Sequence, residues 1–474
     1  MDAKHLSGDY GQDCRTLDEG LRVGCSFDVI GRDIRIAEKA ARLYFIDGFV
    51  KDEILEKLME FMMGLAEGEL PEKLNMGGFC SRFIPYVEAE PCGDTGRLIS
   101  AVLSGTVILL LEGCREAALI DARTYPVRSV QEPDDDKVLR GSRDGFVETL
   151  VFNTALIRRR LRTPQLTMEY LQAGRRSKTD IVLCYLEGQA DSRLVERIRK
   201  KIDSLSVDTL SMGQESLAEA LIGRQWYNPF PKVRYTERPD AAAASAAEGS
   251  ILLLVDNSPS VMILPTSFFD FLQDTNDFYF PPLVGSYLRL VRIAVFLLTL
   301  LLTPVWYLLI RSPEFIPGWL AFIEVAKPNG VPVIVQLLII EFVIDGLKLA
   351  SLNTPSVLSN SFSVVGALIL GDFAVQARWF VPEVVLYMAF VAITNFTQPS
   401  FELGYAFKLF RVLLLVLIHF FGIWGLIGGL VLMGVMLATT ANISGRQYLY
   451  PLIPWNGRAM KSLLIRQSLP RHHS

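Results

Sequence analysis

Charged side chains interrupt one of the apolar stretches in the C-terminal part of this 474-residue chain. Glu341, Asp345 and Lys348 are spaced four and three residues apart in the run VPVIVQLLIIEFVIDGLKLA, which in a helix places them on one face within about 60°. A charge costs about 2.5 to 3.5 kcal/mol at the centre of a membrane, so this face is expected to meet protein or water rather than lipid. The sequence leaves two interpretations open. The three residues form either a vestibule that attracts ions or an internally paired cluster near the cytoplasmic end, with Lys348 reaching Asp345 and Glu341 pairing with another helix.

The following apolar segment has the spacing of a pore-lining helix. Helical periodicity aligns one face with polar ends, an apolar middle and one carboxylate: Ser361, Val365, Leu368, Asp372 and Gln376. In a ring of several copies, the valine and leucine would form a constriction that closes by dewetting, and the Asp372 carboxylates would favour cations. The alternative is ordinary bundle packing, with Asp372 hydrogen-bonded to another helix.

Small residues indicate where helices are expected to pack closely. Gly366 and Gly371 lie on the same segment as the aligned set, and Gly425 and Gly429 form a GxxxG pair in the last apolar segment. Glycine lets two helix backbones approach each other, so these positions predict helix–helix contacts. His419 is expected to be a hydrogen-bonded packing residue, and a pH-sensing role is the alternative.

The first 280 residues contain no motif for catalysis. The six cysteines lie there without a CxxC pair, and of the four histidines only His5 belongs to this part, so we expect no metal, no cofactor, no disulfide and no enzyme. The segment AGRRSKTD lacks the GxxxxGK[ST] spacing of a phosphate-binding loop. A net charge of -4 gives no reason to expect nucleic acid.

The elements that carry the charged residues are apolar enough to span a lipid bilayer. The segment from Tyr287 to Ile310 alone exceeds the roughly 20 apolar residues that a transmembrane helix needs, and residues 283–441 predict four to six helices. The number stays open because Val384 to Phe396 is short, and because Phe410 to Ala438 fits one long helix or a hairpin broken near Gly422 and Gly425.

Basic residues predict the orientation of these segments. Arg289 and Arg292 flank the start of the first segment, and Lys408 and Arg411 are expected to open the fifth. With six crossings all of them lie on the cytoplasmic side, as the positive-inside rule leads us to expect, and the exceptions are Arg311, Lys327 and Arg378. The N-terminal half is then cytoplasmic, and the segment from Tyr448 is expected to be an extended cytoplasmic tail.

The N-terminal half reads as two copies of one soluble α/β fold. LYFIDG at Leu43 to Gly48 recurs as LCYLEG at Leu183 to Gly188, an offset of 140, and each copy leads into an amphipathic helix. The predicted fold class is tandem, duplicated α/β domains followed by an all-α polytopic membrane domain. The expected divisions are a polar N-terminal tail (1–26), a first α/β domain (27–130), a linker (131–145), a second α/β domain (146–282), the membrane domain (283–441) and the C-terminal tail (442–474).

Four basic residues end the helix expected over Phe146 to Leu161, namely Arg158, Arg159, Arg160 and Arg162. Cations at a helix C-terminus are favoured by the helix dipole, which is the simple explanation. The alternative is a docking role against an acidic partner or a lipid headgroup.

Several short motifs together carry a resemblance to a known family. They are GSRDGFVE, the triple arginine, GRRSKT, PFP, TERPD and VGALILG, in this order along the chain. Their order and spacing resemble the A subunits of spore germinant receptors, a membrane family of endospore-forming bacteria, and RDGFVETLVFNTALIRRRLR is most similar to the stage V sporulation protein AF branch. The motif residues singled out are Gly145, Phe146, Glu148, Arg175, Arg176, Glu237, Arg238 and Pro239.

The resemblance implies a multi-pass protein of the inner spore membrane whose N-terminal domains face the spore core. It also implies a homo-oligomer, by resemblance a pentamer, with a second membrane subunit as a further partner, and cation release that amplifies germination. Two hypotheses follow. The chain is either a cation channel or channel component gated through its soluble domains, or a structural scaffold subunit that conducts nothing.

Overall fold

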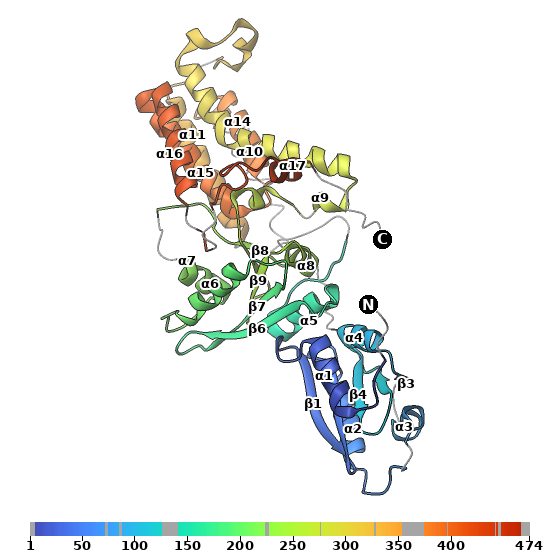
Figure 1. Cartoon of the computed structure of the whole chain (residues 1–474). Coiled ribbons are helices and arrows are strands. Elements are labelled where there is room, and N and C mark those ends of the chain that lie inside the picture. Colours follow the sequence, from blue (N-terminus) through green and yellow to red (C-terminus); the bar gives the residue numbers. More distant parts are fainter. Residues whose placement is uncertain are drawn as a thin grey trace. The chain divides into compact units, whose positions relative to one another are not determined.

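The computed structural model describes residues 5–71, 74–84, 88–125, 141–222, 227–274, 276–326, 329–352, 374–395, 397–440, 442–443 and 447–465. The chain divides into two compact units. The α/β unit consists of Met1–Arg224, Val233–Thr266 and Ile443–Gly445, and the helical unit of Gln225–Lys232, Ser267–Asn442 and Arg446–Ser474. Figure 1 labels the elements of both.

The first domain of the α/β unit is a five-stranded antiparallel sheet in the order β1-β2-β4-β5-β3. Helices α2 and α3 pack on one face of this sheet, and α1 and α4 on the other. The sequence VILLL of β4 is buried at all five positions because helices cover both faces. The elements are α1 (Tyr10–Leu21), β1 (Val29–Ile36), β2 (Lys39–Ile46), α2 (Asp52–Met63), α3 (Met76–Phe83), β3 (Ala89–Cys92), α4 (Thr95–Leu103), β4 (Val107–Leu111) and β5 (Ala117–Ile120).

The second domain repeats this topology, with the strand order β6-β7-β9-β10-β8. Strands β2 and β7 begin at Lys39 and Thr179, which reproduces the offset of 140 found in the sequence. The predicted duplicated α/β fold is therefore confirmed. Its elements are α5 (Leu150–Arg160), β6 (Leu166–Ala173), β7 (Thr179–Leu186), α6 (Ser192–Asp203), α7 (Gln214–Ile222), β8 (Arg234–Thr236), α8 (Pro239–Ala247), β9 (Ile251–Val255) and β10 (Val261–Leu264).

The expected polar N-terminal tail is wrong for residues 10–21, which form α1. The Asp9 side chain caps this helix by accepting a hydrogen bond from the Gln12 amide at 3.0 Å. Leu17 and Leu21, one helical turn apart, are fully buried in the core beneath the sheet. Two buried leucines in an otherwise polar segment are a weak periodic signal, which is why the helix was not expected.

A buried ion pair joins the two α/β domains. The Arg158 guanidinium of α5 donates to both carboxylate oxygens of Asp28, at 2.7 and 2.8 Å, and to Ser26 Oγ at 3.1 Å. Both charged side chains are almost completely buried, with exposed fractions of 0% and 2%. The same guanidinium donates to the Leu166 carbonyl at 3.0 Å, so it connects the start of β1 to the start of β6.

The neighbouring arginines also find partners inside the α/β unit. Arg159 lies 4.5 Å from the centroid of the Tyr125 ring, and Arg160 binds Asp144 at 2.6 Å. The arginine cluster therefore serves contacts within the chain. Arg158, Arg159 and Arg160 do lie in the last turn of α5, as the helix-dipole explanation expects, and Arg160 donates to the Leu156 carbonyl at 3.1 Å. Docking against an acidic partner or a lipid headgroup stays a prediction.

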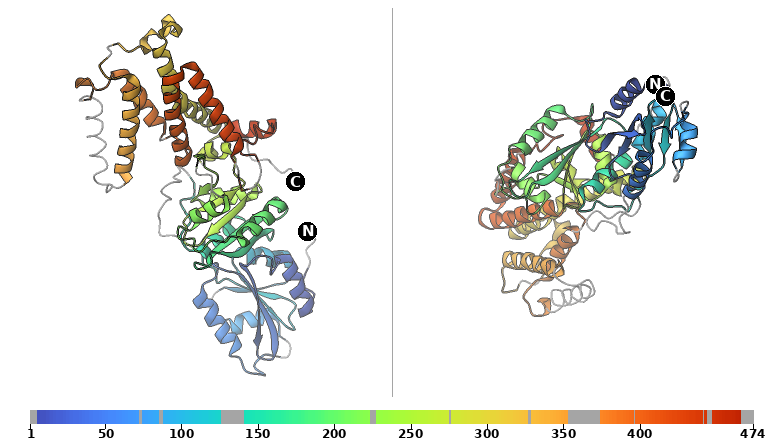
Figure 2. Two further views of the ribbon diagram at one scale, coloured as in Figure 1. Left: turned by 90° about the vertical axis from the view of Figure 1, so that its left-hand side faces the viewer. Right: turned by 90° about the horizontal axis from the view of Figure 1, so that it is seen from below.

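The helical unit contains α9 (Asn276–Tyr279), α10 (Pro282–Arg311), α11 (Val333–Leu352), α13 (Ala374–Gln376), α14 (Pro382–Asn395), α15 (Phe401–Phe421), α16 (Ile423–Thr439) and α17 (Gly457–Leu464). Its long helices lie alongside one another (Figure 2). Among the described residues, α10 and α15 are long and apolar enough to cross a membrane, and α14 and α16 are shorter apolar helices.

Helices α15 and α16 form a hairpin that breaks at Gly422, one of the two alternatives left open by the sequence. Gly422 has φ +58°, a conformation that glycine adopts readily. A Cβ atom at Gly425 would collide with the Leu417 carbonyl, and one at Gly429 would overlap the Leu414 side chain at 2.5 Å. These two glycines lie where the backbones of the two helices approach each other.

The segment from Tyr448 is folded rather than extended, which corrects the expected tail. Tyr448 is fully buried, and its hydroxyl donates to the Pro231 carbonyl at 2.6 Å. Residues 457–464 form α17, and Arg289 donates to the carbonyls of Ser462 and Leu463 at its end. The prolines of this segment suggested an extended course. The contacts of Tyr448 with Pro231 and of Arg289 with α17 instead hold the segment against the helical unit.

The Arg158–Asp28 pair generates a stability prediction. Arg158→Met leaves a buried carboxylate without its partner, so we expect the free energy of unfolding of the full chain to fall by about 3–5 kcal/mol. Thermal unfolding in detergent is the measurement, and Arg162→Met, at an exposed position two residues beyond the end of α5, is the matched control. Equal unfolding midpoints for the two variants would contradict a stabilising pair.

Candidate functional site

Side-chain contacts establish the directions of the helices in the helical unit. The rings of Phe296 and Phe407 are 4.1 Å apart, and eleven and twelve residues further along the Tyr307 hydroxyl bonds His419 Nδ1 at 2.8 Å, so α10 and α15 run parallel. Helix α14 runs opposite to both, since Thr394 contacts Thr299 at 2.9 Å whereas the earlier Tyr387 packs on the later Trp306. The arrangement brings polar residues of four helices together.

A bidentate ion pair lies at the centre of this bundle. Arg411 of α15 donates to Glu341 of α11, from Nε to Oε1 at 2.6 Å and from Nη2 to Oε2 at 3.0 Å. Its third nitrogen donates to the Thr299 carbonyl of α10 at 2.8 Å. Glu341 is 3% and Arg411 1% exposed. The fork-shaped geometry satisfies both charges without water.

A second cation completes the cluster. Lys408 Nζ donates to the Glu341 carbonyl at 3.0 Å, lies 3.5 Å from Glu341 Oε2, and forms an ion pair with Asp345. Lys348 lies over the Tyr405 ring, 5.4 Å from its centroid. We call Glu341, Asp345, Lys408 and Arg411 the charge layer. Its two carboxylates and two cations balance each other, so the interior of the bundle carries little net charge there.

The charge layer lies at mid-length of the helices. Arg411 is the eleventh of 21 residues of α15, and Glu341 is the ninth of 20 in α11. At 1.5 Å per residue, Arg411 is about 15 Å from the start of its helix. The expectation that Lys408 and Arg411 open a span is therefore wrong, because α15 begins at Phe401. An apolar cluster packs on each side of the layer.

Of the residues predicted to line a pore or to pack helices on the segment after α11, the structure describes only Gln376. Ser361, Val365, Gly366, Leu368, Gly371 and Asp372 lie outside the described residues. Gln376 is the last residue of α13 and is exposed. The pore-lining face therefore stays a prediction.

Sequence reasoning missed the partners of Glu341, although a signal was present. Lys408 and Arg411, three residues apart, interrupt the run FKLFRVLLLV, as Glu341 and Asp345 interrupt the run in α11. Two cations with this spacing can face two carboxylates four apart on an antiparallel helix.

Two motifs of the α/β unit, GSRDGFVE and TERPD, meet in one hydrogen-bonded cluster. The Phe146 amide donates to the Glu237 carbonyl at 2.8 Å. The guanidinium of Arg238, which is fully buried, donates to the Ser142 carbonyl at 2.9 Å and pairs with Asp240 at 2.7 Å. GSRDGFVE and TERPD thus hold each other in place, which gives these motifs a structural role.

Of the remaining motif residues, three lie near this cluster in the chain and two lie elsewhere. Gly145 is buried beside Phe146, Pro239 begins α8, and Glu148 is exposed while its carbonyl accepts a hydrogen bond from the Asn257 amide at 2.9 Å. Arg175 and Arg176 lie in the exposed turn between β6 and β7. Their amides donate to the carbonyls of Val207 and Asp208 at 2.9 and 2.7 Å.

Asp144 is the titratable group of this cluster. Burial alone would raise the pKa of its carboxyl, but hydrogen bonds from Arg160 and Ser142 outweigh burial and hold the pKa below its usual range. The ionised form is therefore the one that stabilises the fold at neutral pH.

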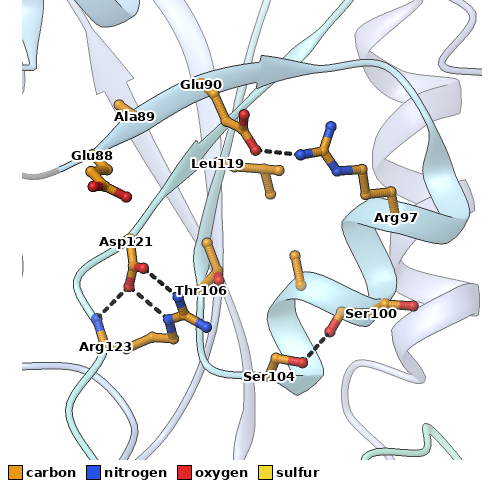
Figure 3. Close-up of a pocket in the computed structure, with 11 residues that line it drawn as sticks. Glu88, Ala89, Glu90, Arg97, Ser100, Ser104, Thr106, Leu119, Asp121 and Arg123 are labelled. Atoms are coloured by element: carbon orange, nitrogen blue, oxygen red, sulfur yellow. Dashed lines mark hydrogen bonds and ion pairs between the residues drawn. The ribbon is translucent and has the colours of Figure 1, made fainter.

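A cavity of about 500 Å³ lies beside α4, β3 and β5 in the first α/β domain (Figure 3). Four of its five charged side chains are paired with each other, Arg97 with Glu90 and Arg123 with Asp121, and the fifth is Glu88. No group of three or more metal-ligating side chains occurs in the part of the chain that the structure describes.

The fold and the charge layer define a class: duplicated α/β domains joined to a helical membrane unit with an ion-paired interior. Residues 16–474 match the family described as Bacillus/Clostridium GerA spore germination protein. Stage V sporulation protein AF of Bacillus subtilis (strain 168) is 38% identical over 449 residues, which cover 94% of this chain and 90% of that protein. Spore germination protein KA of the same strain is 30% identical over 94% of this chain and 82% of its own length.

The chain belongs to the GerA spore germination protein family. The family is described as one of spore germination proteins rather than of enzymes, and this chain is a membrane protein of that family. A crystal structure of the N-terminal domain of the A subunit of the Bacillus megaterium spore germinant receptor GerK3 covers 56% of this chain and 99% of that one. It has 25% sequence identity and a TM-score of 0.43.

Asp144 generates a pH prediction. A lowered folded-state pKa contributes stability above the unfolded-state pKa of about 4, and this contribution is lost as the pH falls through the folded-state value. Asp144→Asn should therefore lower the unfolding midpoint at pH 7, and the difference from the unsubstituted chain should shrink below about pH 4. Thermal unfolding at several pH values is the measurement. A difference that stays constant over this range would contradict the assignment.

The charge layer generates a second prediction. Glu341→Gln leaves two buried cations facing one carboxylate, so we expect a loss of about 3–5 kcal/mol in the free energy of unfolding. Unfolding of the protein in lipid nanodiscs measures it. The matched control is Phe342→Leu, one residue further on the same helix, where the side chain is 79% exposed. Similar losses from the two substitutions would show that Glu341 is not held in a dry pair.

Proposed function

We propose that this chain is a membrane subunit of a spore germination complex that releases cations across the inner spore membrane and amplifies germination. The observation that carries the proposal is a bundle with its charges paired inside and its large apolar side chains outside, in a family of germination proteins. A bundle surface made of large apolar side chains is expected to contact the lipid chains of a membrane. Exposed apolar residues include Leu283, Tyr287, Leu297, Phe342, Leu386, Ile393, Leu409, Phe420, Val431 and Val435.

Helix directions support six crossings. Helix α11 begins beside the start of α14, where the Val381 amide donates to Gln336 Oε1 at 2.8 Å, and Lys348 near its other end lies against Tyr405 in the first turns of α15. The chain therefore leaves α11 at one end of the bundle and starts α14 at the other. We therefore propose six crossings, with the N-terminal domains on the spore-core side.

The conduction path proposed here runs along the face from Ser361 to Gln376 in a homo-oligomer. Glu341 and Asp345 are engaged by Arg411 and Lys408 and are poor candidates for binding a passing ion. Asp372 is then the acidic residue proposed for cation selectivity, with Val365 and Leu368 as the gate. A second membrane subunit is a further proposed partner.

One observation favours the alternative, a scaffold subunit that conducts nothing. A charge layer whose members are paired within one copy is what a closed structural bundle would contain. A scaffold would need neither a gate nor an acidic ring, so the two functions differ in what the residues of the proposed gate do.

Alanine at the proposed gate separates the two functions. Val365→Ala and Leu368→Ala widen an apolar constriction, so a channel should leak cations in resting cells or in single-channel recordings of the purified protein in bilayers. Val435→Ala and Leu409→Ala, at exposed apolar positions of α16 and α15, are the controls and should not leak. Intact membranes with both gate variants would contradict conduction and favour the scaffold.

A further inference from the structure

The duplication places two helices at equivalent positions with opposite charge. Helix α2 follows β2 in the first α/β domain, and α6 follows β7 in the second (Figure 1). Each buries a stripe of apolar residues against its own sheet and exposes the opposite face. The two folds are copies, so the difference between the exposed faces is not imposed by packing.

Helix α2 exposes an acidic face. Its charged residues are four carboxylates and one lysine, and all five are exposed. Phe61 and Met63 at its C-terminal end are also unusually exposed, at 44% and 51%. We define the acidic face as Asp52, Glu53, Glu56, Glu60, Phe61 and Met63.

Helix α6 exposes a basic face. It contains five cationic residues and two carboxylates. Arg199 is engaged by Glu169 at 2.6 Å, and Lys201 donates to the Leu221 carbonyl at 2.6 Å. Arg193, Arg197 and Lys200 are exposed and follow one face, beside a shallow hollow of about 390 Å³. Glu196 lies on the same face and pairs with Lys200 at 3.2 Å, so the face has a net positive charge. These three residues define the basic face.

We propose that the acidic face of α2 in one copy docks on the basic face of α6 in the next copy. The partner is a second copy of this chain because the net charges of the two helices are equal and opposite and because one chain carries both. An anionic membrane surface would account for the basic face but not for the acidic one. This inference rests on the homo-oligomer of the proposed function.

The contact is head-to-tail. It uses two different surfaces, so each copy keeps one acidic and one basic face for further neighbours, and the assembly closes into a ring when the rotation allows. Exposed ion pairs add little affinity individually, whereas matched charges select the partner and its register. Phe61 and Met63 gain apolar burial in the same contact, and the hollow beside α6 offers space for such a side chain.

Cysteine cross-linking in the full-length protein in nanodiscs or spore membranes tests the contact. Cys25, an exposed cysteine, is first replaced by serine. A chain that carries both Glu56→Cys and Arg197→Cys should then give a ladder of dimers, trimers and higher species with a short bis-maleimide. Two differently tagged chains that each carry one of the substitutions should stop at the dimer. In the control, Arg35→Cys, at an exposed position of β1, replaces Arg197→Cys and should give no ladder.

Charge reversal provides the second arm of the test. In this arm the cross-linked cysteines are introduced at Asp52 and Ser204. Reversing Glu53, Glu56 and Glu60 to lysine, or Arg193, Arg197 and Lys200 to glutamate, should each reduce cross-linking at least about tenfold. Combining both reversals should restore it. Cross-linking should also weaken as salt rises.

The outcomes separate this inference from the proposed function. An oligomer that persists without any ladder, or reversals that are not rescued in combination, would overturn the docking of α2 on α6 and leave the homo-oligomer standing. Loss of binding to anionic vesicles on reversal of α6 alone, with no ladder, would assign the basic face to lipid instead. A chain that stays monomeric would overturn both proposals.

Discussion

The pairing of Arg411 with Glu341 is the interaction on which the helical unit depends. An isolated charge is very costly in an apolar bundle, and an ion pair is tolerated there only when its hydrogen bonds are satisfied. The bidentate contact, with the third nitrogen on the Thr299 carbonyl, meets that condition and ties together three helices that are far apart in the sequence. Lys408 and Asp345 extend it, so the register of α11 against α15 is fixed by charge as well as by shape.

In the α/β unit, too, buried arginines bridge separate elements through ion pairs and hydrogen bonds. Arg158 joins the two domains through Asp28, and Arg238 holds the GSRDGFVE segment through the Ser142 carbonyl. A planar guanidinium with several fixed donors can bridge elements in a way that lysine cannot, which explains why arginine occupies these buried positions. Motif residues that invited a binding interpretation therefore serve to connect parts of the fold.

Much of the fold could be predicted because it follows from local periodicity. The strands near Leu43 and Leu183 were visible as a repeat, and the membrane helices as long apolar runs. Helix α1 was missed because only Leu17 and Leu21 mark its buried face. The partners of Glu341 were missed because the signal appears only when the cation spacing of one apolar run is compared with the carboxylate spacing of another run about 70 residues away. Hence the sequence identified the costly charges but not what neutralises them.

The most direct test of this account is a double-mutant cycle on Glu341 and Arg411. Glu341→Met and Arg411→Met are made singly and together, and the free energy of unfolding is measured for all four proteins in lipid nanodiscs. Glu341→Met leaves the Arg411 charge without its carboxylate, and Arg411→Met leaves Glu341 with only the longer contact to Lys408 at 3.5 Å. The double substitution removes both charges and keeps the volume. The account predicts that the double variant is more stable than either single one. Losses that simply add would contradict it, because the two residues would then not be neutralising each other.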